Sequence, residues 1–320
     1  MLEQHARVAR VDRGQATIIS DGDAIRVPTT LPLAVGDWVR LRPPAELELL
    51  PRHTELVRRA AGGPVTSQVL AANVDLALIV HGLDRPLNTR RLQRFSAIAW
   101  DGGVEPVVVL AKTDLVDDVG AEVQAAERAL PGVPVFALSV RDGTGVDGVL
   151  RLAAPGVTIV LVGQSGAGKS TLANLLAGEE RMATGDVRRD GKGRHTTSHR
   201  ELIELPGGAV LIDTPGIRGL ALWDAEAGVE RAFADVGELA EDCRFVDCRH
   251  EGEPGCAVQA ANVDGSLDAQ RLDDHRRLQR ELAALEARQD PRLRSERRKQ
   301  WRAVSRAQRS HYRLNGKGGS

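Results

Sequence analysis

The chain has 320 residues, with 43 Lys and Arg against 44 Asp and Glu, a formal net charge of −1. Its 42% hydrophobic content allows a sizeable core and excludes a wholly disordered chain, a collagen and a globally basic nucleic-acid protein. At about 150 residues per domain, the length predicts about two domains. No run of 18 apolar residues occurs, and residues 1–13 mix charges without an apolar centre. We therefore expect no membrane span, no secretory signal and a cytoplasmic protein.

The first part of the chain, residues 1–64, predicts a small β domain. Apolar and polar residues alternate over 16–19, 24–27 and 38–41, and Gly, Pro and Asp separate these runs. We expect an OB-type β-barrel, an architecture that often binds nucleic acid, and an SH3-like barrel is the alternative.

The middle part, residues 65–222, predicts an α/β domain. Helical spacing occurs between the apolar runs, and the expected strands are 74–80, 107–110, 133–138, 157–162, 202–205 and 209–212. The expected helices are 88–100, 117–130 and 169–176. Continuously apolar strands between helices predict a mostly parallel sheet that is covered on both faces.

The last part, residues 223–320, predicts a helical domain with a basic tail. Leu278, Leu282 and Leu285 share one helix face. Residues 291–317 hold ten basic residues and one acidic residue, a net of +9, so the remainder carries about −10. A basic tail on an acidic body favours a polyanionic partner, and a solvated Arg-rich helix would give the same pattern.

A phosphate-binding loop follows the expected strand 157–162. The residues match G-x-x-x-x-G-K-[ST] and precede an expected helix, as this motif requires; they are Gly163, Gln164, Ser165, Gly166, Ala167, Gly168, Lys169 and Ser170, followed by Thr171. Backbone N–H groups would converge on phosphate oxygens. Lys169 would reach the β and γ phosphates, and the Ser170 hydroxyl would ligate Mg²⁺.

Two further segments complete the expected triphosphate site. Asp213 ends a strand, which suits a contact to Mg²⁺, and the N–H of Gly216 would sense the γ-phosphate. Between the phosphate loop and Asp213, a hydroxyl of Thr196 or Thr197 would complete the Mg²⁺ shell, and either residue fits. The alternative for this segment is an exposed loop without a role.

A guanine pocket is expected at the ends of two successive strands. Ala111, Lys112, Thr113 and Asp114 follow the strand 107–110, and Ser139 ends the next one. The Asp114 carboxylate can accept hydrogen bonds from N1–H and the 2-amino group of guanine, donors that adenine lacks. Lys112 would lie along the base, and the backbone N–H at Ser139 would contact O6. An ATPase is the competing hypothesis.

The three cysteines of the chain lie close together with a histidine. The spacing of Cys243, Cys248, His250 and Cys256 is C-x4-C-x-H-x5-C. Three thiolates and one imidazole form a closed tetrahedral set that suits structural Zn²⁺. A chance cluster of buried thiols is the alternative, and a thiol redox role is disfavoured because C-x-x-C spacing is absent.

The order of these motifs carries a family resemblance. The guanine elements at Lys112 to Asp114 and Ser139 precede the phosphate loop, whereas they usually follow it. The chain thus resembles the circularly permuted GTPases, and among them the ribosome small subunit-dependent GTPases of bacteria. The resemblance also rests on residues 71–75, 193–197 and 213–216 and on the Cys/His cluster. It covers nearly the whole chain, and its one departure is Ala111, where the family usually has Asn or Thr.

The resemblance implies a GTP-binding and GTP-hydrolysing factor, cytoplasmic and expected to be monomeric, that acts on the small ribosomal subunit and its rRNA in late maturation. It also implies bound Zn²⁺, and Mg²⁺ held by Ser170, Thr196 and Asp213. A zinc-stabilised rRNA-binding module, whose nucleotide site only regulates docking, is the alternative.

The hydrolytic step is expected to depend on a partner. Many GTPases place a Gln directly after D-x-x-G to orient the attacking water, and Ile217 stands there in this chain. Intrinsic hydrolysis should therefore be slow. We expect the subunit to order residues 194–198 and bring His195 near the water, with Lys169 and Thr196 or Thr197 as the other catalytic groups.

Overall fold

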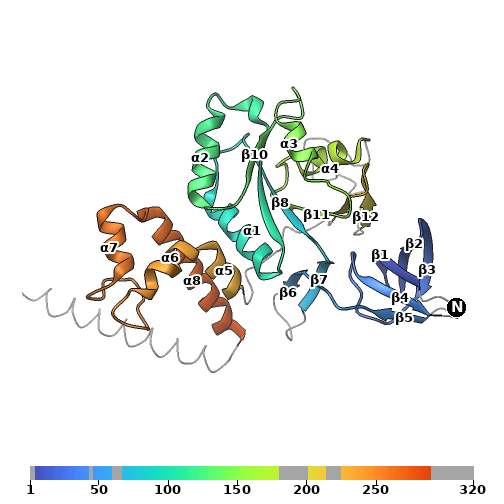
Figure 1. Ribbon diagram of the computed structural model, residues 1–320, viewed down its shortest axis with the longest axis horizontal. Helices are drawn as coiled ribbons and strands as arrows, with labels where there is room; N and C mark the ends of the chain where they lie inside the picture. Colours follow the sequence, from blue (N-terminus) through green and yellow to red (C-terminus); the bar gives the residue numbers. More distant parts are fainter. Residues whose placement is uncertain (1–3, 43–45, 60–66, 180–200, 214–224, 290–320) are drawn as a thin grey trace, which may run out of the picture.

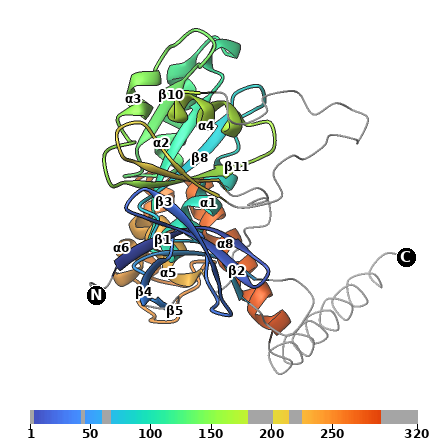
Figure 2. The ribbon, with the colours of Figure 1, turned by 90° about the vertical axis from the view of Figure 1, so that its right-hand side faces the viewer.

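The computed structural model describes residues 4–42, 46–59, 67–179, 201–213 and 225–289. In this part of the chain an α/β domain lies between an N-terminal β domain and a C-terminal helical domain (Figure 1). In the view of Figure 2 the sheet of the α/β domain lies above the other two domains. The predicted boundaries near residues 64 and 222 fall in segments outside the described residues, so they stay predictions.

The N-terminal domain is a five-stranded antiparallel sheet, ordered β3-β2-β1-β4-β5. Its strands are β1 (Gln4–Asp12), β2 (Gln15–Ser20), β3 (Asp23–Pro28), β4 (Trp38–Arg42) and β5 (Glu46–Leu49). Alternate residues such as Ala6, Val8 and Ile18 form its core. The predicted N-terminal β domain is confirmed, and the three expected strands correspond to β2, β3 and β4.

The central domain contains a six-stranded sheet, ordered β10-β9-β8-β11-β13-β12. Its strands are β8 (Leu76–Gly82), β9 (Glu105–Ala111), β10 (Val135–Leu138), β11 (Thr158–Gly163), β12 (Glu201–Glu204) and β13 (Val210–Asp213). All neighbours pair in parallel except the edge strand β12, which is antiparallel to β13. The predicted mostly parallel sheet is confirmed.

Helices cover both faces of this sheet. They are α1 (Thr89–Asp101) and α2 (Val119–Ala129) on one face, and α3 (Val146–Leu150) and α4 (Lys169–Ala177) on the other (Figure 1). Successive residues of β8 point to opposite faces: Ile79 packs in the cluster that includes Leu92 of α1, and Val80 packs in the cluster that includes Leu172 of α4. Both faces are therefore buried, which explains why the strands are continuously apolar.

The carboxyl ends of the parallel strands lie along one edge of the sheet. β8, β9, β10, β11 and β13 all run in the same direction. The loops that follow these strands meet at that edge, where open α/β sheets bind their ligands. The guanine motif, the phosphate loop and Asp213 are thereby brought to one place, although they lie far apart in the chain.

A short hairpin and a polar joint connect the β domain to the central domain. β6 (Glu55–Arg59) and β7 (Ser67–Ala72) form a two-stranded sheet. Arg7 on β1 donates to the Thr158 hydroxyl at the start of β11 (2.7 Å) and to the carbonyl of Asn73 (3.1 Å). A Cβ on Gly36 would lie 2.2 Å from the carbonyl oxygen of Ala72, so the close approach of the two domains requires glycine there.

The C-terminal domain is helical in the described residues and packs on α1. Its helices are α5 (Glu226–Ala232), α6 (Ala234–Glu241), α7 (Ala257–Asp264) and α8 (Ala269–Gln289). A Cβ on Gly228 of α5 would lie 1.9 Å from the carbonyl oxygen of Ala97, so α5 and α1 approach each other closely. Leu278 and Leu282 of α8 are buried, as expected. None of the described helices combines the length and the apolarity needed to cross a bilayer.

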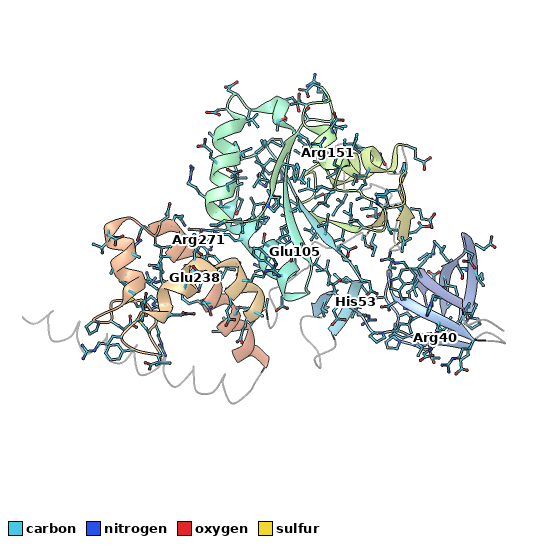
Figure 3. The ribbon with its side chains drawn as sticks, in the orientation of Figure 1. Arg40, His53, Glu105, Arg151, Glu238 and Arg271 are labelled. Atoms are coloured by element: carbon cyan, nitrogen blue, oxygen red, sulfur yellow. The ribbon has the colours of Figure 1, made fainter. Side chains whose placement is uncertain are left out.

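Arg271 forms polar contacts between the helical domain and the central domain. Its side chain is only 6% exposed and lies where α8 meets α2 and α5 (Figure 3). The guanidinium forms an ion pair with Asp235 (2.5 Å) and donates to the carbonyls of Ala129 and Ala232, both at 2.7 Å. The buried charge is therefore paired and hydrogen-bonded, as burial requires.

Candidate nucleotide site and metal centre

The phosphate loop joins β11 to α4, as the motif predicts. Gly163 and Gly168 have φ angles of 142° and 104°, which L side chains rarely adopt. A Cβ on Gly163 would also lie 2.2 Å from the carbonyl oxygen of Val80. The Lys169 ammonium donates to the carbonyls of Gly163 (2.9 Å) and Gln164 (2.5 Å), so the loop curls around this charge. The positive end of α4 and Lys169 together favour an anion here.

Two residues that could supply oxygen ligands to a divalent cation belong to this region. Ser170 is exposed in the first turn of α4, and Asp213 ends β13. Burial, and then the charge of Glu201, raises the pKa of Asp213, whereas Lys169 lowers it. A cation between Asp213 and the phosphates would stabilise the ionised carboxylate, so the residues fit a hard cation such as Mg²⁺.

The first half of the guanine motif contacts the phosphate loop. Lys112 follows β9 in the left-handed conformation, with a φ angle of 63°, and its ammonium donates to the carbonyl of Gly166 (2.8 Å). A strained backbone of this kind is maintained only where the surroundings fix it. The Lys112 side chain thus spans from the end of β9 to the loop that would receive phosphates.

The second half presents a carboxylate. Asp114 lies in the short 3₁₀ helix Thr113–Leu115, and its side chain is 17% exposed. The buried Ser139 hydroxyl donates to Asp114 Oδ1 (2.8 Å), which orients the carboxylate. Arg141, which is 82% exposed, lies 3.6 Å from Oδ2. Both oxygens therefore face the loop after β10, where a guanine edge could replace the exposed arginine.

The described residues bring part of the expected site together. Ala111 and Thr113 are buried beside Lys112 and Asp114, and residues 163–171 form the adjoining loop and helix start. The expected residues that lie outside the described part of the chain are His195, Thr196, Thr197, Gly216 and Ile217.

The sequence motifs do not include one acidic and one basic residue that lie next to this site. Asp84 and Arg85 follow β8 and lie 3.2 Å from Lys112 and 3.3 Å from Gln164, respectively. They belong to no familiar pattern. Their position directly after a parallel strand is the signal that could have found them.

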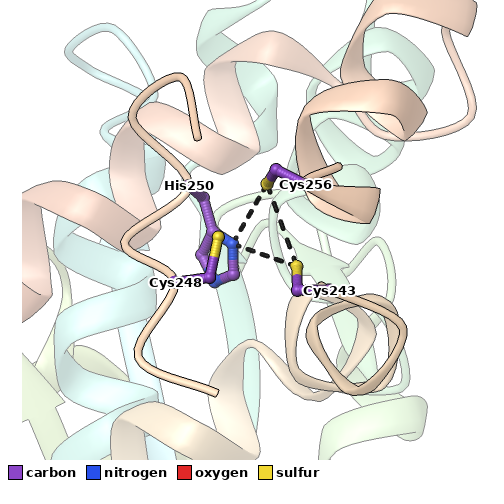
Figure 4. A group of neighbouring side chains, drawn as sticks. All are labelled: Cys243, Cys248, His250 and Cys256. Carbon is purple, nitrogen blue, oxygen red and sulfur yellow. Dashed lines mark hydrogen bonds between the residues drawn. The ribbon is translucent and has the colours of Figure 1, made fainter. Parts of the chain in front are cut away.

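The cysteines and the histidine form the predicted cluster (Figure 4). Their ligand atoms all lie within 4.8 Å of one another. Cys243 Sγ lies 3.8 Å from Cys256 Sγ, and His250 Nδ1 lies 3.6 Å and 3.4 Å from these two sulfurs. Ligands about 2.3 Å from a common tetrahedral centre are about 3.8 Å apart, so the group fits a metal ion.

The surroundings of the cluster shift the pKa values of its thiols in opposite directions. Burial raises the pKa of Cys243, but hydrogen bonds from the N–H groups of Val258 and Ala257 at the start of α7, together with those from the Cys256 and Cys248 side chains, outweigh it and lower the pKa overall. Burial and the neighbouring sulfurs raise the pKa of Cys248 to about 11. Three thiols this close do not all ionise unless a cation offsets their repulsion, and a divalent metal ion would do so.

Comparisons with known proteins agree with this arrangement. A family model described as RsgA GTPase matches residues 49–223. The chain is 49% identical over 314 residues to the small ribosomal subunit biogenesis GTPase RsgA of Streptomyces avermitilis, covering 92% of this chain and 84% of that protein. The protein of the same name from Opitutus terrae is 44% identical over 334 aligned positions, covering 98% of this chain and 90% of that protein.

Solved structures show the same fold. YjeQ from Thermotoga maritima superposes with a TM-score of 0.65 at 25% identity, covering 87% of this chain and 97% of that one. YloQ, described as a circularly permuted GTPase, has a TM-score of 0.64 at 24% identity, covering 90% of this chain and 97% of that one. The predicted permuted GTPase fold is thereby confirmed.

Proposed function

The chain belongs to the RsgA GTPase family, and on this premise we propose that it binds GTP and hydrolyses it on the small ribosomal subunit during late maturation. The names of its relatives supply the subunit as partner. A role on this subunit and its rRNA also implies a cytoplasmic protein, and we expect it to act as a monomer.

One observation carries the nucleotide part of the proposal. Lys112 donates to the phosphate loop while Asp114, two residues later, presents its carboxylate beside Ser139. A phosphate site and an acceptor for guanine donors are thus joined through three consecutive residues. An adenine base has neither the N1–H nor the 2-amino group that would donate to the Asp114 carboxylate, which favours guanine.

The residues of this chain would divide the work as follows. Lys169 and the amides at the start of α4 would hold the phosphates, and Ser170 and Asp213 would hold Mg²⁺, which neutralises phosphate charge when bound. Ile217 cannot orient water, so we assign that role to His195 once the subunit has ordered residues 194–198. Thr196 or Thr197 would contribute the remaining hydroxyl.

We assign the metal cluster to structural Zn²⁺. Three sulfurs and one imidazole nitrogen are the donors that zinc prefers, and four protein ligands leave no position open for substrate. The cluster would thus fix residues 243–256 between α6 and α7, with no part in hydrolysis.

The test is the GTP turnover of the purified chain with and without small ribosomal subunits. We expect slow turnover alone and strong stimulation by subunits, with Lys169→Ala inactive in both conditions. His195→Ala should lose the stimulation while retaining GDP affinity. Full stimulation in His195→Ala would remove this residue from the mechanism.

The same measurement tests the second candidate, an rRNA-binding module whose nucleotide site regulates docking only. The apolar Ile217 after D-x-x-G favours it, because this side chain cannot activate water. Nucleotide-dependent subunit binding without stimulated turnover would support the module and contradict the proposed hydrolysis. Binding to rRNA should weaken steeply as salt rises in either case.

A further inference from the structure

A loop that belongs to no recognised motif contacts both the guanine motif and the phosphate loop. We call residues 83–86, which follow β8, the bridging loop. The N–H of Leu83 donates to the carbonyl of Ala111 (2.8 Å), where the guanine motif begins. The side chain of His81 is only 4% exposed and lies against the backbone of Arg85 and Pro86. The bridging loop is therefore attached to the sheet at its first residue, and its last residues lie against a buried side chain of β8.

One carboxylate in the bridging loop holds two cations. Asp84 Oδ2 lies 3.2 Å from the Lys112 ammonium and 3.1 Å from the Arg85 guanidinium. Asp84 and Arg85 are 27% and 37% exposed, so the pairs are partly shielded from solvent. Burial raises the pKa of Asp84, but the bonds from Arg85 and Lys112 outweigh it and lower the pKa, which keeps the carboxylate ionised at neutral pH.

Both cations reach the phosphate loop. Lys112 donates to the carbonyl of Gly166 (2.8 Å), and Arg85 Nη1 donates to Gln164 Oε1 (3.3 Å). Arg85 Nη2 also lies 3.4 Å from the position that a Cβ on Gly166 would take. The two side chains thus contact residues 164–166, whose backbone N–H groups would face the phosphates.

The polar attachment through Lys112 matters because the neighbouring contact between the two motifs, at Ala111, is apolar. The Cβ of Ala111 lies 3.5 Å from the position that a Cβ on Gly168 would take, and an alanine side chain offers no hydrogen bond. Orientation of the phosphate loop relative to the guanine motif therefore depends on Lys112 and on the groups that hold it.

We propose that Asp84 and Arg85 are positioning residues of the nucleotide site: Asp84 fixes Lys112 and Arg85, and Arg85 holds residues 164–166 in the conformation that receives phosphates. The proposal deepens the proposed function and rests on its nucleotide site. It assigns to the bridging loop the rigid spacing between base and phosphates, a form of preorganisation that improves affinity without new ligand contacts.

Calorimetric titration of the full-length protein with GDP tests the proposal. We expect Asp84→Asn to weaken GDP binding about tenfold and Arg85→Ala about fivefold, because charge-assisted hydrogen bonds are lost at partly exposed positions. Arg128→Ala removes the same charge from an exposed position on α2 and should bind GDP within twofold of the unchanged protein.

A double-mutant cycle separates positioning from a general loss of structure. If Arg85 acts through Gln164, Arg85→Ala should cost less than twofold when Gln164→Ala is already present. The melting temperature without nucleotide should stay unchanged in both single variants, because neither side chain is buried.

Two results would overturn the proposal while leaving the proposed function intact. One is GDP binding within twofold of the unchanged protein in both Asp84→Asn and Arg85→Ala. The other is full additivity of Arg85→Ala and Gln164→Ala. If the unchanged protein binds no guanine nucleotide at all, the proposed function itself fails.

Discussion

All four side chains of the metal cluster come from residues 243–256, whereas the nucleotide site takes its side chains from loops spread between residues 84 and 213. The cluster is local: its ligands converge because one short segment turns back on itself between α6 and α7. The nucleotide site converges only because five parallel strands end at one edge. The difference teaches that the conformation of the first site should depend on binding of a metal ion, and that of the second on the sheet.

Loss of the metal should give the largest effect and should separate the two sites. Cys256→Ser removes a buried ligand, and we expect the helical domain to lose more than about 5 kcal/mol, because metal binding contributes directly to folding. Zinc content and far-UV circular dichroism would measure the loss, and GDP binding should persist. Val263→Ser, at an exposed position, is the control. Loss of GDP binding in Cys256→Ser would show that the sites are coupled.

Arg271 joins the helical domain, which holds the Cys/His cluster, to the central domain, which holds the nucleotide site. Any coupling between the two sites would pass through this contact. Arg271→Met leaves the buried Ala232 carbonyl and Asp235 without their donor, whereas the Ala129 carbonyl still accepts from Gln93, so we expect the free energy of unfolding to fall by about 3 kcal/mol. Urea unfolding would measure it. Arg277→Met, exposed on the same helix, should change stability by less than about 0.5 kcal/mol. Equal effects of the two variants would contradict the importance of this joint.

Removal of the phosphate-loop lysine should affect only the nucleotide site. We expect Lys169→Ala to weaken GTP binding about 100-fold, or about 2.7 kcal/mol, since its charge would meet the phosphates directly. Zinc content should remain that of the unchanged protein. Arg128→Ala controls for the loss of one positive charge. Retention of GTP affinity within threefold would place the triphosphate elsewhere.

A change of the base-reading carboxylate should be smaller and selective. In Asp114→Asn one acceptor becomes a donor, so we expect about 30-fold weaker GDP binding, or about 2 kcal/mol. The variant should prefer xanthosine diphosphate, whose C2 oxygen accepts the new amide donor. Asp117→Asn, an exposed neighbour, should bind GDP normally. Equal loss for both bases would indicate a distorted pocket.

The same contrast explains what the sequence could predict. The cluster follows from spacing alone, because a local site needs only a turn that brings Cys243 to Cys256. Strands β8 to β11 were predictable because burial on both faces makes them continuously apolar. β1 was missed because Ala6 and Val8 alternate with arginines, so its inward face is only weakly apolar.

The nucleotide site was predictable only where a motif marks it. The phosphate loop and Asp114 have fixed neighbours in the chain, and the structure confirms that the strands before them end at one edge. Arg85 and its partner Gln164 are 79 positions apart in the chain, and Asp84 is the residue before Arg85. Only the pairing of β8 with β11 brings these residues together. Contacts that depend on strand order leave no pattern in local sequence.

Acidification should give the smallest effect, and His81 carries the part of it that acts on the sheet. Burial lowers the pKa of His81, which lies on β8 beneath the bridging loop. In the unfolded chain His81 has a pKa of about 6.5, so below that pH the unfolded chain binds a proton at His81 that the folded chain does not bind. The contribution of His81 to stability is therefore complete above that pH and falls below it. The loss should reach about 1.4 kcal/mol for each further pH unit until the folded pKa is reached.

The His81→Gln variant isolates the pH-dependent contribution of His81 to stability, because glutamine can still hydrogen-bond but does not titrate. Urea unfolding at pH 7.5, 6.5 and 5.5 should show a shallower loss in the variant than in the unchanged protein. Protonation of the cluster thiolates lowers stability equally in both chains, so it cancels in the difference. Identical pH dependence would mean that the edge of the sheet opens to admit the proton, and the nucleotide site would then be less rigid than its hydrogen bonds imply.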